Sequence, residues 1–180
     1  GHETTATALA WAFYCVLRTP GVEESLLEEL AALGPDPDPA EMSECDYLEA
    51  VCEETLRIHP IVPMIARRLQ DEVQIGDYTF RAGLTAAPAI YLAHHREQTF
   101  SDPDSFRPER FIDTRYDHSE YLPFGGGSRR CLGAHLALYE MKLVLGTILR
   151  RADLELVDPD SIRPVRRLVT VAPSDGARLV

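Results

Sequence analysis

Apolar residues recur at helical spacing through the first third of the chain, where breakers divide them into separate predicted helices. Residues 1–18 carry Ala, Leu, Trp, Phe, Tyr and Val with no breaker after the opening glycine, which predicts a buried helix. Thr19-Pro20 resembles a cap followed by a proline at the first helical position. A second helix is therefore predicted from there to about Gly34.

A proline-rich segment, residues 35–39, predicts a stiff exposed loop after this second helix. A third helix is predicted from about Ser43 to Ile58, and Pro60 ends it. The acidic residues of the second helix give it one face that we expect to be exposed to water: Glu23, Glu24, Glu28 and Glu29.

The pattern changes from helical spacing to alternation after Pro63. Apolar and polar residues alternate over 73–75 and again over 78–80, and the pair Gly76-Asp77 between them supplies a two-residue turn. This pattern predicts a β-hairpin. Another short strand is predicted after Gly83.

The rest of the sequence combines a long loop, one apolar helix and short strands. Residues 97–123 hold three prolines and many polar side chains, and they predict a long ordered loop. A final helix, about Gly133 to Arg150, is apolar on most faces and is expected to be buried. Short strands are predicted from Leu154 onward. Helices followed by small sheets indicate an α+β fold that is mainly α.

Composition and charge narrow the class of partner. The 180 residues suit one domain, and 45% hydrophobic with 26% charged residues is typical of a soluble globular protein. A net charge of -11 repels phosphate backbones, which disfavours nucleic acid as a partner. No apolar run reaches about 18 residues, so we expect no membrane segment in this part.

The four cysteines indicate the redox state of the compartment in which the protein folds. None of them shows the spacing of a metal clip, and four would be few for a secreted disulfide scaffold: Cys15, Cys45, Cys52 and Cys131. We therefore expect a reducing compartment and a cytoplasmic location.

The segment Phe124-Gly-Gly-Gly-Ser-Arg-Arg-Cys-Leu-Gly133, here called the cysteine loop (residues 124–133), precedes the final helix. A phosphate site is disfavoured, because the loop has no lysine and its glycines are not spaced as in a dinucleotide fingerprint. Cys131 is close to a helix N-terminus and to Arg129 and Arg130. All three favour the thiolate over the thiol.

Three roles are open for this cysteine. A nucleophile needs a base, and only His135 is near in sequence. A buried structural cysteine at the start of a helix is a common alternative. A ligand to a large flat cofactor fits better, because glycines remove side chains where a plane must approach the backbone: Gly125, Gly126, Gly127 and Gly133.

The cysteine loop resembles a known signature. Its pattern Phe124-x-x-Gly127-x-Arg129-x-Cys131-x-Gly133 is similar to the haem-binding motif of cytochrome P450, the haem-thiolate monooxygenases. The resemblance implies that Cys131 is the axial ligand of the iron of haem b (iron protoporphyrin IX). It also implies that Phe124, Gly127 and Gly133 belong to the haem-binding segment.

Three further motifs occur in the order of the same family. Residues 54–57, Glu-Thr-Leu-Arg, resemble its Glu-x-x-Arg motif, and residues 106–111, Phe-Arg-Pro-Glu-Arg-Phe, resemble the segment that completes that network. Residues 1–5 resemble the motif of the helix on the oxygen side of the haem. The resemblance implies that residues 1–180 are the C-terminal haem-ligating part of one cytochrome P450 domain. The N-terminal half of that fold, with any anchor it carries, then lies outside this sequence.

The acidic and basic residues of these motifs have a physical interpretation as well. Glu54 and Arg57 are three positions apart on a predicted helix and can pair, either on the surface or in an apolar neighbourhood. The resemblance implies that Arg110 completes the bonding of Glu54 in a structural network. It further implies that Thr4 and Glu3 help to deliver protons during oxygen activation, with a frayed polar helix end as the alternative.

Other basic residues are assigned by the resemblance. It implies that Arg129 binds one haem propionate and Arg67 the other, with the adjacent Arg68 as a rival. Arg130 is a candidate for contact with an acidic redox partner. We expect the pair His94-His95 to be solvated.

The substrate contacts implied by the resemblance are apolar, with plain core packing as the alternative for each: Ile61, Val62, Met64, Ile65, and the turn near Leu168 and Val169. The implied reaction inserts one atom of O2 into a small apolar organic substrate. Its electrons would come from a separate ferredoxin-type or flavoprotein partner, because the chain has no flavin or nicotinamide fingerprint. A non-catalytic haem-binding remnant or inactive fragment is the alternative, and a cysteine-nucleophile hydrolase is disfavoured for want of a base.

Overall fold

The computed structural model describes residues 1–180, and its fold is α+β and mainly α, as the sequence predicts. The α-helices are α1 (His2–Arg18), α2 (Val22–Ala32), α3 (Pro39–Ser43), α4 (Asp46–Ile58), α5 (Ile90–His94) and α6 (Ala134–Leu149). The strands are β1 (Arg67–Arg68), β2 (Val73–Ile75), β3 (Tyr78–Phe80), β4 (Thr85–Ala86), β5 (Pro164–Arg167) and β6 (Thr170–Pro173). Three short 3₁₀ turns are η1 (Pro108–Phe111), η2 (Gly127–Arg129) and η3 (Pro159–Ser161).

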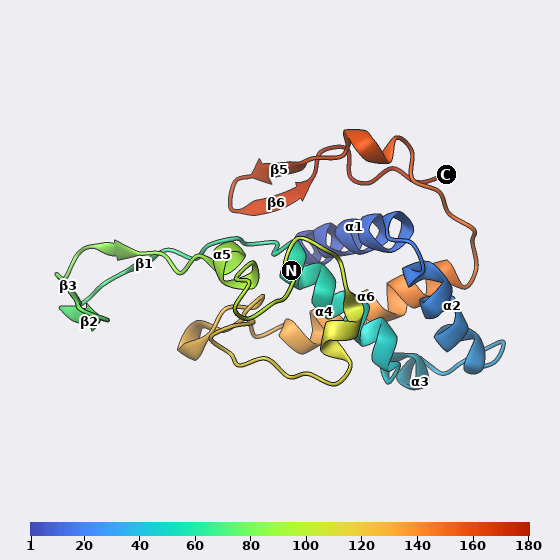
Figure 1. The fold of residues 1–180 in the computed structure, drawn as a ribbon, viewed down its shortest axis with the longest axis horizontal. Helices are drawn as coiled ribbons and strands as arrows, with labels where there is room; N and C mark the ends of the chain where they lie inside the picture. The colour runs from blue at the N-terminus through green and yellow to red at the C-terminus, as the bar shows by residue number, and fades with distance from the viewer.

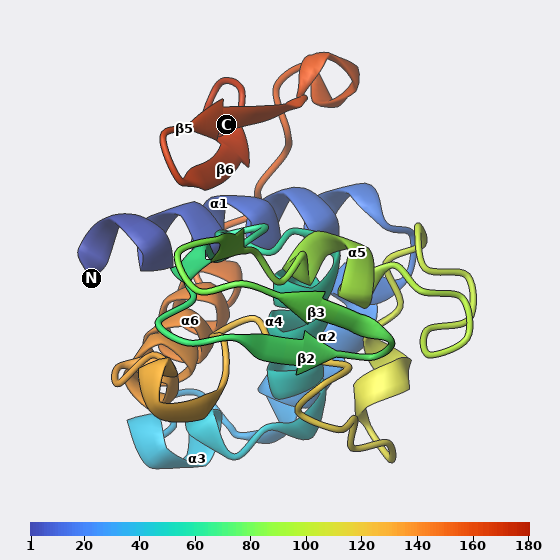
Figure 2. The same ribbon diagram turned by 90° about the vertical axis from the view of Figure 1, so that its left-hand side faces the viewer.

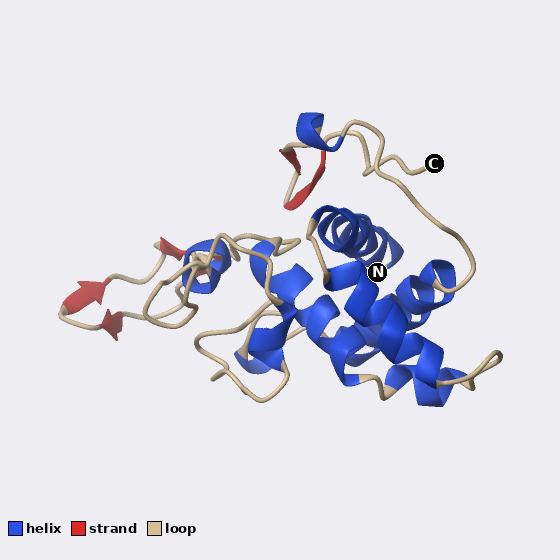
Figure 3. Cartoon of the chain, turned by 45° about the vertical axis from the view of Figure 1, so that its right-hand side comes forward, coloured by secondary structure: helices blue, strands red, loops and turns tan.

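The larger helices form one body around a single apolar core. Helices α1, α4 and α6 contact one another, while α2 packs on α4 and α3 packs on α6. Figure 3 shows these helices gathered together, with the strands in parts that project from them. Gly146 on α6 permits a close approach, because a Cβ there would lie only 2.9 Å from Met42 Sδ and 3.4 Å from Leu30 Cδ2.

The second helix begins later than predicted. Helix α2 begins at Val22 rather than at Pro20, and its N-cap is Gly21 in a left-handed conformation with φ +82°. Glycine adopts the left-handed backbone conformation more easily than any other amino acid, because it has no Cβ. The chain therefore turns at Gly21, directly after the proline. The predicted cap at Thr19-Pro20 is therefore wrong.

The predicted third helix is α4, which begins at Asp46, three residues after the predicted start, and ends at Ile58 as predicted; the short helix α3 before it was not predicted. Asp38 and Glu41 form a capping box at the start of α3, and the chain then turns before α4 begins at Asp46. Glu29 was expected on a solvated face, but its carboxylate accepts hydrogen bonds from the backbone N–H groups of Tyr47 (2.8 Å) and Leu48 (2.9 Å). It therefore caps α4 from a neighbouring helix, which a local sequence pattern does not show.

Three two-stranded antiparallel sheets complete the fold. The predicted hairpin is β2–β3, with Val73 opposite Phe80, and Figure 1 shows it standing away from the helical body. Strands β5 and β6 lie beside α1, where the Trp11 indole N–H donates to the Val171 carbonyl (3.1 Å). The Trp11 ring also stacks on His59 with the ring centroids 3.8 Å apart.

Helix α6 is less buried than its composition suggests. Its buried residues include Met141 and Leu145, but several apolar side chains of the same helix are exposed: Leu136, Tyr139, Val144 and Ile148. The expectation of a buried helix is thus correct for one face of α6 and wrong for the other. None of the helices combines the length and hydropathy that crossing a lipid bilayer requires.

Candidate functional site

The carboxylate of Glu54 is the centre of a buried ionic cluster. Arg57 donates to it from Nε (2.7 Å) and Nη2 (2.9 Å), which is the bidentate geometry that a guanidinium and a carboxylate favour. Arg110 donates from Nε (3.1 Å), and the backbone N–H of Arg107 adds a further bond (2.9 Å). We call Glu54, Arg57 and Arg110 the Glu54 cluster.

The side chains of the Glu54 cluster are shielded from solvent, and each of their buried nitrogen and oxygen atoms has a hydrogen-bond partner. Glu54 and Arg57 have 0% exposure, and Arg57 also donates to the carbonyls of His94 (2.8 Å) and Ser105 (3.3 Å). No buried side-chain nitrogen or oxygen of the chain lacks a hydrogen-bond partner. A buried ion pair is stable only when its remaining donors and acceptors are bonded in this way. The predicted contacts are present, and the structural role remains a prediction.

His94 differs from its expected state. It has 0% exposure, and its ring makes two hydrogen bonds, one to the Arg57 carbonyl (3.1 Å) and one from the Leu122 N–H (3.0 Å). Burial lowers the pKa of His94 to about 4, so the ring is neutral at pH 7. The expectation of a solvated pair is wrong for His94, while His95 is half-buried and stacks on Tyr91.

The cysteine loop is shaped by its own backbone. The Cys131 N–H donates to the Phe124 carbonyl (3.0 Å), the Arg130 N–H donates to Gly127 (3.1 Å), and the Gly125 N–H donates to Leu122 (2.9 Å). These bonds close a compact turn directly before α6.

Cys131 is the exposed cysteine of the chain, because Cys15, Cys45 and Cys52 are buried. Burial raises the pKa of the Cys52 thiol to about 12 and that of Cys15 higher still. These two are therefore thiols at neutral pH and poor ligands for a metal. Cys131, at the start of a 16-residue helix, is accessible to a ligand from outside the chain.

Two of the loop glycines have a reason that does not involve a cofactor. Gly125 (φ +70°) and Gly127 (φ +63°) are left-handed, a conformation that other residues adopt with strain. A Cβ at Gly125 would also lie 3.1 Å from Ile65 Cδ1. For Gly126 and Gly133, backbone conformation gives no such reason. At these two positions clearance for a ligand remains the better explanation.

The arginines assigned to haem propionates lie on separate elements. Arg129 is exposed in η2, and Arg67 is exposed in β1 and donates to its own neighbour, the Ala66 carbonyl (2.9 Å). Neither forms an ion pair within the chain. Both guanidinium groups are therefore available to an anionic ligand, and Arg68, also exposed in β1, remains a rival of Arg67.

Glu3 and Thr4 lie exposed in the first turn of α1. The Thr4 hydroxyl donates to the Gly1 carbonyl (2.8 Å), and the Thr7 hydroxyl donates to the Glu3 carbonyl (2.9 Å). Figure 2 shows this end of α1 and the segment leading into α6 on the same side of the molecule. The start of α1, with Glu3 and Thr4, thus lies on the same side of the molecule as the segment that leads into α6. The roles of Glu3 and Thr4 in moving protons remain predictions.

The predicted substrate residues divide into buried and exposed positions. Ile61 is in the core, and its carbonyl accepts the Val171 N–H (2.9 Å). Val62 and Ile65 are half-buried, whereas Met64 is 56% exposed and Val169, in the β5–β6 turn, is 67% exposed. Burial favours core packing for Ile61 and leaves the others accessible.

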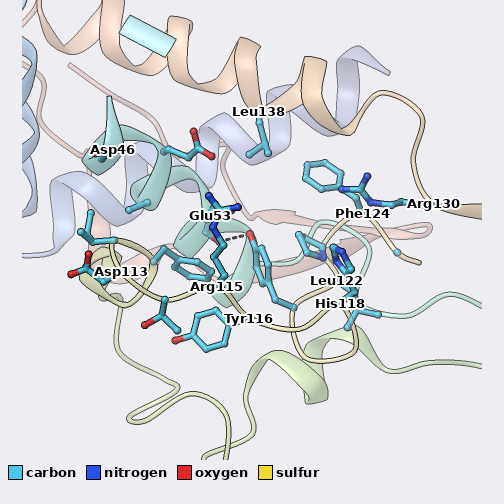
Figure 4. A pocket seen from close by; sticks show the side chains of 18 residues that line it. Asp46, Glu53, Asp113, Arg115, Tyr116, His118, Leu122, Phe124, Arg130 and Leu138 are labelled. Carbon is cyan, nitrogen blue, oxygen red and sulfur yellow. Dashed lines mark hydrogen bonds between the residues drawn. The ribbon is translucent and has the colours of Figure 1, made fainter. Parts of the chain in front are cut away.

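A cavity of about 790 Å³ lies between α4, the segment 111–125 and α6 (Figure 4). Its lining includes Glu53 and, from the cysteine loop, Phe124 and Arg130, but neither Cys131 nor Thr4. Burial, followed by the nearby Glu49, raises the pKa of Glu53 to about 7. Sequence patterns gave no signal for this half-buried carboxylate.

The geometry gives no support to a nucleophilic cysteine. His135 is exposed on α6, and no hydrogen bond joins its ring to Cys131. A nucleophile needs a base within hydrogen-bonding reach of the thiol.

Comparison with known proteins gives a consistent result. The family model described as "Cytochrome P450" matches residues 1–178. The protein named "Putative cytochrome P450 135B1" from Mycobacterium tuberculosis is 41% identical over 181 residues, and the match covers 99% of this chain and 37% of that protein. "Probable cytochrome P450 4d20" from Drosophila melanogaster is 39% identical over 158 residues, covering 83% of this chain and 31% of that protein.

A solved structure agrees with these relatives. The crystal structure of a cytochrome P450, CYP102L1, superimposes with a TM-score of 0.87 at 28% identity. The match covers 99% of this chain and 42% of that chain. The present chain therefore spans between 31% and 42% of the length of these three proteins.

Proposed function

The chain belongs to the cytochrome P450 family, and from this premise we propose that residues 1–180 are the haem-ligating part of a haem-thiolate monooxygenase domain. The observation that carries the proposal is the environment of Cys131. Its thiol is exposed at the start of α6, in a loop whose backbone bonds hold it in place, while two of the other three cysteines are fixed as buried thiols.

The residues around the thiol fit haem b. Cys131 offers one sulfur ligand, glycines with open space above their Cα atoms adjoin it, and exposed arginines are free to bind carboxylates. The apolar side chains of Met64 and Leu136 are exposed and suit the flat apolar ring of a porphyrin. We propose Cys131 as the axial ligand, with Arg129 and Arg67 as the propionate partners.

When bound, the haem would supply the chemistry that activates O2 for insertion into a carbon–hydrogen bond. The tasks of the chain are to hold the sulfur, the propionates and the substrate, and to move protons. Thr4 and Glu3 are proposed to move protons, because both side chains are accessible on the same side of the molecule as the cysteine loop. The Glu54 cluster is proposed to keep α4 fixed against the segment that leads to this loop.

The proposed substrate is a small apolar organic molecule. This is supported by the apolar side chains that are accessible near the cysteine loop and in the β5–β6 turn: Val62, Met64, Ile65 and Val169. The proposed electron donor is a separate ferredoxin-type or flavoprotein partner, since the chain itself has no flavin or nicotinamide motif. Arg130, exposed beside Cys131, is the proposed contact for an acidic partner.

A carbon-monoxide difference spectrum of the full-length reduced protein tests the proposal. Thiolate ligation gives a strongly red-shifted Soret band, and Cys131→Ala should abolish this band. The matched control is Cys45→Ala, which removes a buried cysteine far from the loop in sequence and should keep the band. A red-shifted band that survives in Cys131→Ala would contradict the assignment.

The alternative function is a non-catalytic haem-binding remnant. It is distinguished by product analysis of the full-length protein with its electron donor and a library of apolar substrates. Because residues 1–180 match only 37% of the length of a similar protein and so supply only part of the proposed domain, we expect residues 1–180 alone to bind haem poorly. Stoichiometric haem uptake by this fragment would overturn that expectation.

A further inference from the structure

His94, the last residue of α5, connects the Glu54 cluster with the cysteine loop. A backbone N–H can only donate and a carbonyl can only accept, so the two ring bonds fix the tautomer. His94 Nδ1 carries the proton and donates to the Arg57 carbonyl, while Nε2 is unprotonated and accepts from the Leu122 N–H. The bond in the other direction, from Arg57 Nη1 to the His94 carbonyl (2.8 Å), locks the pair.

The orientation of the ring is fixed on its other sides. Tyr121 stacks on it with centroids 5.3 Å apart, and Phe100 meets its edge at 6.4 Å. The Tyr121 hydroxyl donates to the Glu53 carbonyl on α4 (2.9 Å), so the stacking partner is itself held. With 0% exposure, the ring has no water to replace either hydrogen bond.

Leu122 transmits this position to the cysteine. Its carbonyl accepts the Gly125 N–H (2.9 Å), which sets the first turn of the cysteine loop. The Phe124 carbonyl then accepts the Cys131 N–H (3.0 Å). A continuous path of hydrogen bonds and short peptide segments therefore runs from Arg57 through the His94 ring to Cys131.

We propose that His94 is a positioning residue, which fixes the backbone of Leu122 against the Glu54 cluster and so fixes the place of the Cys131 sulfur. The inference rests on the proposed function for its consequence, which is the geometry of thiolate ligation. Its structural content, the anchoring of residues 122–131 by His94 Nε2, holds whether or not the chain binds haem.

The experiment compares two substitutions that each preserve half of the ring's bonding in the full-length haem-loaded protein. The amide of His94→Gln can place an acceptor near the position of Nε2, so it should keep the Leu122 bond. The amide of His94→Asn is shorter and can keep only the donor near Nδ1. The control is His59→Asn, which removes another imidazole ring, one that is half-buried and stacks on Trp11.

Two readouts are measured on the folded protein. The first is the red-shifted Soret band with carbon monoxide per bound haem, together with the rate of haem release. The second is amide hydrogen exchange in residues 122–131, which does not depend on haem chemistry. We expect His94→Asn to raise haem release and exchange in this segment by about tenfold, as the loss of one buried hydrogen bond implies. His94→Gln should stay within about twofold of wild type, and His59→Asn should change neither readout.

The outcomes separate the two proposals. Exchange and haem release that remain at the wild-type level in His94→Asn overturn the inference, as does an equal loss in His94→Gln. If His94→Asn does not fold, the Gln variant decides alone, since retained protection supports the inference and lost protection overturns it. A wild-type protein without the red-shifted band contradicts the proposed function, and the exchange measurement still tests the anchoring.

Discussion

The Glu54 cluster and the cysteine loop lie close to each other along one path of hydrogen bonds, and they are held in different ways. Glu54 and Arg57 are fully buried and Arg110 nearly so, and the charges of these side chains pair with one another. The cysteine loop is largely exposed, and backbone bonds hold it, while Arg129 and Arg130 are exposed and form no ion pair within the chain. The charged groups of the Glu54 cluster find all their partners within the chain, whereas the thiol and the guanidinium groups of the cysteine loop are accessible to a ligand or partner from outside it.

This difference separates two properties that a ligand site needs. Rigidity comes from a charged network that is costly to disturb, and reactivity comes from a sulfur that stays accessible. The ring of His94 joins the two regions, because it donates to the Arg57 carbonyl and accepts from the Leu122 N–H just before the cysteine loop. Substitutions in the Glu54 cluster should therefore lower the stability of the fold, whereas substitutions in the cysteine loop should affect ligand binding.

The largest effect is expected for Arg57→Ala. Removal of the guanidinium leaves the Glu54 carboxylate buried without its bidentate partner, and breaking a buried pair in this way costs about 3–5 kcal/mol. Denaturant unfolding of the full-length protein measures the change. The control is Arg18→Ala, which breaks the exposed pair with Asp160 and should cost less than about 1 kcal/mol. Equal losses of unfolding free energy in the two variants would contradict the prediction that the buried ion pair contributes more to stability than the exposed one.

An intermediate effect is expected for Glu53→Gln, because Glu53 lines the cavity between α4 and the loop (Figure 4). Burial raises the pKa of Glu53 from 4.5 to about 7, so the wild-type protein should lose stability as the pH rises through this interval. Below it the carboxyl is neutral in both the folded and the unfolded chain. After allowance for the solvent that reaches this group, the loss is about 1–2 kcal/mol. The variant should lack this part of the pH dependence in unfolding titrations that span pH 4.5 to about 7, and identical slopes in the two proteins would contradict the raised pKa of Glu53.

The smallest effect on stability is expected for Arg129→Ala in the cysteine loop. The side chain is exposed and makes no ion pair within the chain, so the free energy of unfolding should change by less than about 0.5 kcal/mol. Haem release from the full-length protein should nevertheless become faster, if this arginine binds a propionate as proposed. A large loss of stability, measured by thermal unfolding of the apoprotein, would show that the residue has a structural role instead.

The sequence predicts contacts well where the partners share one element. The pairing of Glu54 with Arg57 needs only a helix, since residues three apart lie on one face. The β2–β3 hairpin is equally local, because Gly76-Asp77 specifies the turn and alternation specifies the strands. The family resemblance added Arg110, which meets Glu54 from 56 positions away.

The sequence predicts poorly where distant backbone groups decide. His94 was expected in solvent because it precedes the long loop, but its partners are the carbonyl of Arg57 and the N–H of Leu122. Glu29 was expected in solvent as well, although it caps α4. Backbone donors and acceptors occur at nearly every residue, so no side-chain pattern announces which of them a polar group will meet.

The bond between Trp11 and Val171 joins positions 160 residues apart, and this has a consequence for synthesis of the chain. During translation α1 leaves the ribosome long before β6 exists, so the indole N–H and the apolar face of α1 must wait for almost the whole sequence to emerge. A chain that stops before β6 (Thr170–Pro173) would leave the part of α1 that β6 covers exposed, and such truncated products are natural targets for chaperones and proteases.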